Sequence, residues 1–367
     1  MDPISVKTTP PYTIHIQPTL LAQLPTLLKP LFLGKRLGII TQPNLISSYA
    51  TPLKNALIEA GWDVHVFTIP QGETTKSLDT IHSLLDQLIP LRFERIDGLL
   101  ALGGGVVGDI TGFLASIYLR GIKFAQIPTT LLAQVDAAIG GKTGVNHPLG
   151  KNLIGTFYQP QLVAIDPETL RTLPAVEWKS GLAEILKYGF IQNPDIIAIL
   201  QNHLETISKF DYDTNPHLWE TLIYLSAECK AKVVSKDEKE SNLREILNFG
   251  HTLGHAIEAE FHYTHYSHGE AIALGMLGAT RMARALGYCD LHTLATLETL
   301  LEELGFDRHI HPCSVPALID KLYSDKKVRH NAIRWIFPQE IGQVITTAEI
   351  PLTLIEQVIK DMMPHHA

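Results

Sequence analysis

The chain has 367 residues, of which 45% are hydrophobic and 19% charged, the composition of a packed globule of roughly two domains. Its 30 basic and 38 acidic side chains leave a formal charge of −8, which argues against nucleic acid as the main partner. No run of about 18 apolar residues occurs, so we expect no membrane-spanning helix and no membrane partner. The three cysteines form no C-x-x-C pair, which predicts reduced thiols and a cytoplasmic protein.

Short β-rich runs alternate with helical patterns in the first half of the chain. Strands are predicted at 36–41, 63–69, 96–102, 123–127 and 162–165, and helices at 45–60 and 77–89. Since the strands are apolar on both faces, they indicate a parallel sheet covered by helices. We therefore expect an α/β domain over residues 1–174.

The pattern becomes helical after about Pro174. Helices are predicted at 176–191, 217–234, 243–261, 269–286 and 291–304. Strand-like runs return only at 332–337 and 343–347, and they are too short and isolated to form another sheet core. We therefore expect an all-α second domain over residues 175–367.

A glycine-rich motif follows the third predicted strand. Gly103, Gly105 and Gly108 satisfy G-x-G-x-x-G between a strand and a helix, a pattern that lets the backbone approach a pyrophosphate at a helix N-terminus. No acidic residue ends a following strand about 20 positions later, as the usual dinucleotide fingerprint requires. The motif alone therefore fits a phosphate site or a tight strand–helix turn.

A second glycine-rich segment carries two lysines. Gly141, Lys142 and Thr143 imitate the end of a P-loop, but Asp136 occupies the position where a P-loop needs its first glycine, which excludes a P-loop NTPase. What remains is a glycine-rich loop bearing Lys142 and Lys151. Such a setting favours lysines that hold an anion over lysines that are merely solvated.

A histidine cluster predicts a metal site. His251 and His255 are spaced i, i+4 on one helix face, which lets two imidazoles share an ion such as zinc. Arg244 and Asn248 share a face with His251 because they precede it by seven and three residues. The pattern leaves the third ligand open among four residues, namely Glu184, His262, His265 and His268.

Taken together, these segments resemble the 3-dehydroquinate synthases over about residues 36–330. The resemblance rests on GGGVVGD at 103–109, IPTTLLAQVDAAIGGKTGVN at 127–146, GKNLIGTFYQP at 150–160, GLAEILKYG at 181–189, LREILNFGHTLGHAIEAE at 243–260, HGEAIALGM at 268–276 and DKK at 325–327. It implies a Rossmann-like NAD-binding domain followed by a helical metal- and substrate-binding domain. It also implies an active site in the cleft between them and a homodimer.

The resemblance also implies roles for individual residues. It assigns zinc or cobalt to Glu184, His251 and His268, and leaves His255 to contact the substrate. The residues implied to contact NAD are Asn44, Gly72, Glu73, Lys76, Gly104, Gly105, Val106, Val107, Gly108, Asp109, Thr129, Thr130, Lys142, Lys151, Thr169, Leu170, Arg171 and Thr172. Those implied to contact the substrate are Asp136, Lys142, Asn152, Lys187, Lys230, Arg244, Asn248, His255, one of Lys326 and Lys327, and Arg120 of a neighbouring subunit.

The reaction implied is that of a carbon–oxygen lyase in the shikimate pathway. It converts 3-deoxy-D-arabino-heptulosonate 7-phosphate, a sugar-acid phosphate, to 3-dehydroquinate and phosphate, with transient oxidation by NAD. Sister sugar-phosphate cyclases and NAD- and metal-dependent polyol dehydrogenases are the alternatives. The chain departs from the family at Gln42 and Gln71, where aspartate is frequent on the adenosine side of the NAD site.

Overall fold

The computed structural model describes residues 1–324, 333–348 and 350–364, which form two compact units. Unit 1 contains Met1–Leu173 together with Pro216–Lys239, and unit 2 contains Pro174–Asn215 and the chain from Glu240 onward. The chain first passes from unit 1 to unit 2 between Leu173 and Pro174. Helix α8 (Pro216–Lys236) nevertheless belongs to unit 1, because it packs against β1, which a single boundary at residue 174 does not anticipate.

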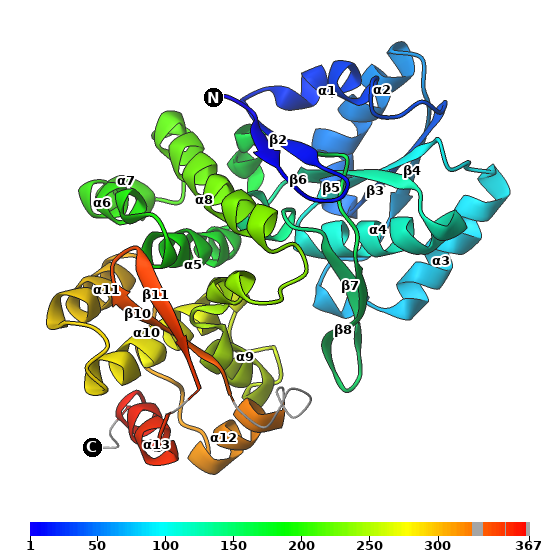
Figure 1. The fold of residues 1–367 in the computed structure, drawn as a ribbon. Helices are drawn as coiled ribbons and strands as arrows, with labels where there is room; N and C mark the ends of the chain where they lie inside the picture. Colours follow the sequence, from blue (N-terminus) through cyan, green and yellow to red (C-terminus); the bar gives the residue numbers. More distant parts are fainter. Residues whose placement is uncertain (325–332, 349, 365–367) are drawn as a thin grey trace. The chain divides into compact units, whose positions relative to one another are not determined.

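Unit 1 is built on a seven-stranded sheet (Figure 1). All neighbouring strands are parallel except β1 and β2, as the apolar strand runs predict. In spatial order the strands are β1 (Ile4–Val6), β2 (Tyr12–Ile16), β9 (Leu162–Ile165), β6 (Lys123–Pro128), β5 (Gly98–Gly103), β3 (Arg36–Thr41) and β4 (Asp63–Thr68).

Helices cover both faces of this sheet. Successive residues of one strand enter opposite hydrophobic clusters: Ile39 packs with helices α1 and α2, and Ile40 with α3 and α4. Both faces of the sheet are therefore buried from solvent, which explains why the strands are continuously apolar. The helices are α1 (Leu20–Leu28), α2 (Thr51–Glu59), α3 (Leu78–Leu88) and α4 (Gly105–Ile117); a 3₁₀ turn (Pro43–Leu45) and a π-helical turn (Ile46–Ala50) precede α2.

The second glycine-rich segment is a β-hairpin rather than the expected loop. Strands β7 (Lys142–His147) and β8 (Gly150–Phe157) pair antiparallel. Two glycines allow their close approach: a Cβ on Gly144 would lie 2.5 Å from the Ile154 carbonyl oxygen, and one on Gly155 would lie 2.2 Å from that of Thr143. Lys142 and Lys151 are therefore placed on paired strands.

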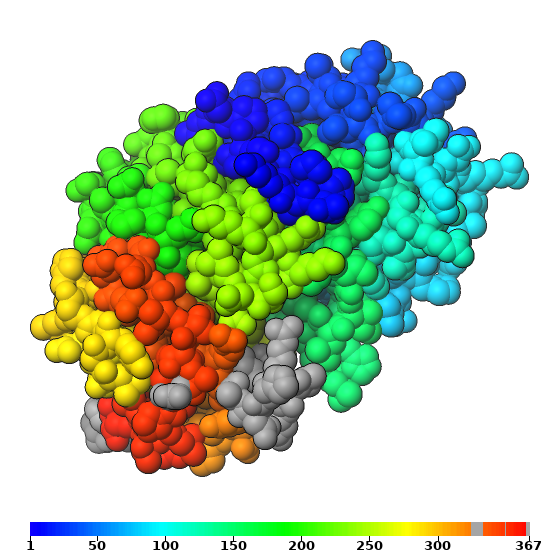
Figure 2. All heavy atoms as spheres, in the orientation of Figure 1, coloured from blue at the N-terminus to red at the C-terminus, as the bar shows by residue number. Residues whose placement is uncertain are grey.

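Unit 2 is mostly helical, with α10 in contact with α5, α9, α11 and α13. It is not all-α, because β10 and β11 form an antiparallel hairpin that lies beside α11 at the surface of the unit (Figure 2). The elements are α5 (Ala175–Ile191), α6 (Pro194–Asn202), α7 (Leu204–Ile207), α9 (His251–Glu260), α10 (His268–Ala285), α11 (Leu291–Glu303), α12 (Val315–Ser324), β10 (Trp335–Glu340), β11 (Gln343–Thr347) and α13 (Leu352–Asp361).

The helix predicted over 243–261 is interrupted. A 3₁₀ segment, η8 (Leu243–Asn248), precedes α9, and Gly250 between them has φ 79°. A side chain at Gly250 would meet Met276 Cγ at 2.5 Å, so glycine is required both for the turn and for close packing on α10. The interruption makes His251 the first residue of α9. Among the described residues, no helix is long and apolar enough to cross a membrane.

Candidate active site

Unit 1 gathers the residues implied for NAD at one edge of its sheet. The carboxyl ends of parallel strands meet at the same edge, where doubly wound proteins bind nucleotides. Apart from Lys142 and Lys151, which lie on β7 and β8, the implied residues follow five of these ends: Asn44 follows β3; Gly72, Glu73 and Lys76 follow β4; Gly104, Gly105, Val106, Val107, Gly108 and Asp109 follow β5; Thr129 and Thr130 follow β6; and Thr169, Leu170, Arg171 and Thr172 follow β9.

Helix α4 begins at this edge. The G-x-G-x-x-G motif joins β5 to α4: Gly103 ends the strand, Gly104 precedes the helix, and Gly105 and Gly108 lie in its first turn. A side chain at Gly108 would meet Gln126 Oε1 at 2.7 Å, so glycine lets α4 pack directly on β6. The free N–H groups at the start of α4 make an electropositive end that suits a pyrophosphate.

An ion pair between a buried lysine and a half-buried aspartate joins two of the implied NAD contacts. Lys76 Nζ lies 2.5 Å from Asp109 Oδ2. Burial raises the pKa of Asp109, against the opposing effect of Lys76. Lys76 Nζ also donates to Asn152 Oδ1 at 2.5 Å, which brings a residue implied for the substrate next to the implied NAD contacts.

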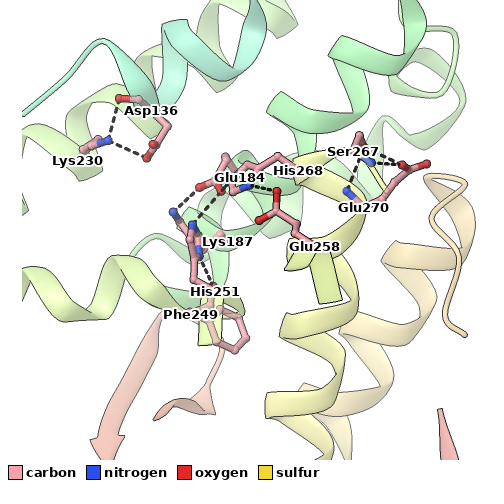
Figure 3. A network of polar contacts seen from close by, with 10 residues as sticks. All are labelled: Asp136, Glu184, Lys187, Lys230, Phe249, His251, Glu258, Ser267, His268 and Glu270. Carbon is pink, nitrogen blue, oxygen red and sulfur yellow. Dashed lines mark hydrogen bonds and ion pairs between the residues drawn. The ribbon is translucent and has the colours of Figure 1, made fainter. Parts of the chain in front are cut away.

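A second pair in unit 1 joins Lys230 to Asp136 (Figure 3). Lys230 Nζ lies 2.9 Å from Asp136 Oδ1 and donates to the Asp136 backbone oxygen at 2.8 Å. Asp136 lies in a π-helical turn (Ala133–Ala137), and Lys230 comes from α8. Both residues are implied substrate contacts, and the structure brings them together although 94 positions separate them.

In unit 2, three side chains present metal-ligating atoms to one another. Glu184 of α5, His251 of α9 and His268 of α10 each offer one such atom, all within 4.8 Å of one another. Glu184 Oε1 lies 3.6 Å from Nε2 of each histidine. The other carboxylate oxygen, Oε2, forms an ion pair with Lys187 Nζ, and both of these side chains are 1% exposed (Figure 3).

The far side of each imidazole also faces an acceptor. His251 Nδ1 lies 3.1 Å from the Phe249 backbone oxygen, and His268 Nδ1 lies 3.6 Å from Glu258 Oε1. This arrangement is typical of metal sites, where such partners fix the tautomer and orientation of the ligating imidazole. A capping box of Ser267 and Glu270 holds the start of α10, and with it His268.

Electrostatics at these three side chains fit a divalent cation. Burial, followed by Lys187, lowers the pKa of His251 well below its usual value, so this imidazole is neutral and able to ligate. Although burial opposes it, hydrogen bonding to Glu184 and Glu258 raises the pKa of His268 to about 9. Two carboxylates thus stabilise positive charge at His268, a charge that a metal ion supplies when it displaces the proton.

A second trio of possible ligands shares His268. His255, Glu258 and His268 also place ligand atoms within 4.8 Å of one another. Neither of the two trios found among the described residues contains both His251 and His255, although their ring centroids are 5.2 Å apart. His265 packs its ring against Tyr266 and His311 instead. Helical spacing alone therefore does not identify the ligand set.

The remaining implied substrate contacts are distributed over both units. Arg244 in η8 is buried at 1% exposure, and Asn248 donates to Glu240 Oε1 at 3.3 Å. Lys142 and Arg120 are exposed residues of unit 1. Lys326 and Lys327 lie outside the described residues.

Two residues beside these sites were not predicted from the sequence. Glu258 follows His251 by seven positions, so its place on the same helix face was a usable signal. Asn146 lies at the end of β7 and contacts both Glu73 and Asn152. Since the segment was expected to be a loop, its sequence carried no comparable signal.

Comparisons with known proteins cover both units. The family model of the 3-dehydroquinate synthase N-terminal region matches residues 66–180, and that of the C-terminal region matches residues 181–328. A curated 3-dehydroquinate synthase from Rippkaea orientalis is 44% identical over 357 residues, which make up 96% of this chain and 95% of the relative.

Two solved structures are similar over nearly their whole length. The 2-epi-5-epi-valiolone synthase of Streptomyces hygroscopicus subsp. jinggangensis, with NAD+ and Zn2+ bound, has a TM-score of 0.87 at 27% identity and 96% coverage of both chains. A 2-deoxy-scyllo-inosose synthase complexed with carbaglucose-6-phosphate, NAD+ and Co2+ has a TM-score of 0.88 at 26% identity, covering 99% of this chain and 100% of that one. With both family regions matched and 44% identity along almost its entire length, the chain belongs to the 3-dehydroquinate synthase family.

Proposed function

We propose that this chain converts 3-deoxy-D-arabino-heptulosonate 7-phosphate to 3-dehydroquinate and inorganic phosphate. The observation that carries the proposal is the convergence of Glu184, His251 and His268 in a chain 44% identical to a curated 3-dehydroquinate synthase. The two sister cyclases reported above are 27% and 26% identical to this chain, so the curated relative is the stronger guide to the substrate.

The site is proposed to use NAD and a divalent metal, Zn2+ or Co2+. Similar cyclases hold NAD+ with Zn2+ or with Co2+, and the buried donor set of two imidazoles and a carboxylate suits either ion. When bound, the metal supplies Lewis acidity toward a substrate alcohol, and NAD supplies reversible hydride chemistry.

The chain's own residues are proposed to position charge. Arg244 and Lys187 are buried cations in unit 2, suited to hold the carboxylate and hydroxyl groups of the substrate. In unit 1, the two bonds from Lys230 hold Asp136 in one orientation. Such a site works by binding and orienting its substrate, which accounts for many cationic residues and no nucleophilic triad.

The proposal extends to the assembly and location of the enzyme. A cytoplasmic homodimer fits the resemblance, in which Arg120 reaches the substrate phosphate of the neighbouring subunit. The exposed position of Arg120 in unit 1 leaves its side chain available for such a contact. The three cysteines are free thiols, which fits a reducing compartment.

The proposed conversion requires NAD only in catalytic amounts. The substrate contains the same atoms as 3-dehydroquinate plus phosphate, so the reaction has no net oxidation. The hydride transferred to NAD early in turnover is therefore returned before the product is released. We expect phosphate release to exceed the NAD supplied by about 100-fold or more, because one cofactor serves many turnovers. The measurement is phosphate release at a limiting NAD concentration, with NADH absorbance followed in parallel.

A polyol dehydrogenase would give a different result. It would produce NADH in proportion to substrate consumed and release no phosphate. Stoichiometric NADH would therefore overturn the proposed function. The sister cyclases are distinguished by their substrates, so assays with heptulose and hexose phosphates lacking the acid group form the control.

Gln42 and Gln71 give a prediction about cofactor affinity. Gln42 Nε2 donates to the Pro70 backbone oxygen at 3.3 Å. Gln71, the residue after Pro70, is exposed. An aspartate accepts a hydroxyl hydrogen bond more strongly than a neutral amide. We expect Gln42→Asp or Gln71→Asp to lower the NAD dissociation constant about threefold to tenfold, measured by calorimetric titration. Unchanged affinity in both variants would show that neither position contacts the ribose.

A further inference from the structure

Asn146 lies at the centre of a hydrogen-bonded cluster in unit 1. Its Nδ2 donates to Glu73 Oε1 at 2.8 Å, and its Oδ1 accepts from the Asn152 backbone N–H at 2.9 Å. Its own backbone N–H donates to the Lys76 backbone oxygen at 2.7 Å. One half-buried side chain thus joins the segment after β4 to both strands of the β7–β8 hairpin.

The contact to Asn152 fixes an unusual backbone conformation. Asn152 has φ 55°, in the left-handed region that few residues other than glycine and asparagine adopt. Asn146 Oδ1 holds the N–H of this residue, and Lys76 Nζ holds its side-chain Oδ1 at 2.5 Å. Both ends of Asn152 are therefore tied to the segment that carries Glu73 and Lys76.

We propose that Asn146 is a positioning residue that couples cofactor binding to the placement of Asn152. The inference rests on the proposed function and on the roles that the family resemblance implies, Glu73 and Lys76 toward NAD and Asn152 toward the substrate. Lys76 also pairs with Asp109 at the start of α4, so the cluster extends to the pyrophosphate end of the cofactor site. When NAD orders the segment 73–76, Asn146 and Lys76 order Asn152 with it.

The effect differs from that of a simple binding contact. Removing a residue that only touches NAD raises the NAD dissociation constant and leaves kcat unchanged once NAD is saturating. Removing Asn146 also frees the backbone N–H of Asn152, so its left-handed conformation is no longer held and kcat remains low even at saturating NAD and substrate. The loss of kcat at saturation distinguishes positioning from affinity.

The first variant is Asn146→Ala, assayed with zinc-loaded protein. We expect the NAD dissociation constant to rise about tenfold and kcat at saturation to fall about tenfold, since two side-chain hydrogen bonds are lost. His147→Ala is the matched control, because His147 bonds the Leu149 N–H within the same hairpin turn. Calorimetry gives NAD affinity, phosphate release gives kcat, and thermal unfolding gives Tm.

A charge-matched pair tests the Glu73 contact. Asn146→Asp keeps the acceptor for Asn152 but sets a carboxylate against that of Glu73, so we expect a greater loss than in Asn146→Ala. Adding Glu73→Gln restores the hydrogen bond, with the new amide at position 73 donating to the new carboxylate at position 146. The double variant is expected to recover kcat at saturating NAD at least threefold over Asn146→Asp. This comparison holds even if Asn146→Ala has a reduced Tm.

Several results would overturn the inference. The inference is wrong if Asn146→Ala behaves like His147→Ala, or if Asn146→Ala keeps full kcat at saturating NAD. It is also wrong if the double variant has no higher kcat than Asn146→Asp. NAD titration needs no turnover. Failure of the wild-type chain to release phosphate, with the NAD affinities changing as expected, would therefore count against the proposed function and not against the coupling.

Discussion

Zinc is expected to be lost from His251→Ala and retained by His255→Ala, although both histidines lie on α9. Two trios of side chains converge in unit 2, and His268 belongs to both, so its removal does not distinguish them. The trio of Glu184, His251 and His268 is the more buried, and both of its imidazoles have an acceptor at Nδ1. We therefore expect it to hold the metal.

The expected size of the effect follows from ligand count. Loss of a direct ligand in His251→Ala or Glu184→Gln should weaken zinc binding by more than about 100-fold and abolish phosphate release, because loss of an outer partner alone typically costs about 10- to 100-fold. Glu258→Gln, which alters the partner of His268 Nδ1, should fall in that lower range. His255→Ala should keep zinc but turn over slowly.

Zinc content after dialysis and the absorption spectrum of the cobalt-loaded protein are the measurements. Both report on coordination without turnover. Retained zinc in His251→Ala together with loss in His255→Ala would reverse the assignment in favour of the trio of His255, Glu258 and His268.

Much of the fold of unit 1 follows from local sequence. The predicted strand 36–41 is β3, and Ser77 caps α3 through its side chain, which fits the predicted helix 77–89. These elements are readable because their apolar spacing matches their own geometry. The β7–β8 hairpin could not be predicted in this way, because the glycines in this segment suggest a loop. In the structure, Gly144 and Gly155 lie opposite each other on the two paired strands.

In unit 2, part of the candidate metal site could be predicted from sequence spacing and part could not. His251 could be identified as a ligand candidate from spacing, but the helix that carries it was predicted to continue through Gly250. The positive φ of Gly250 depends on close packing against Met276, 26 positions away, which no local pattern records. Glu184 and His268 come from other helices, so their approach to His251 is a property of packing and not of spacing.

The unit to which α8 belongs could not be predicted from the sequence either. Its periodicity predicts a helix over 217–234, yet nothing in that periodicity says which unit receives it. The structure places it in unit 1, where Lys230 bonds Asp136. A charged pair that joins two remote segments is visible only once both are folded.

The second large effect is a loss of kcat/KM when Lys142 or Arg244 is changed. Because Lys142 is exposed and Arg244 is buried, the two positions need different substitutions. Lys142 is exposed at the start of β7, so Lys142→Ala should leave Tm unchanged while lowering kcat/KM about 10- to 100-fold, the value of one charge-assisted contact to an anionic substrate. Arg244 is 1% exposed, and alanine there would leave a cavity that confuses stability with activity.

For Arg244 the informative change is therefore to lysine. Lysine keeps the positive charge and most of the volume but loses the planar fork that binds a carboxylate through two bonds. We expect Arg244→Lys to lower kcat/KM by about tenfold or more with a Tm close to that of the wild-type chain, and Arg244→Met, which removes the charge, to lower it further. Lys54→Ala, at a half-buried position of α2, serves as the control for loss of a cation. If Lys142→Ala and Arg244→Lys both match this control in kcat/KM, neither cation contacts the substrate, and buried lysines such as Lys187 and Lys230 become the next candidates to hold the anion.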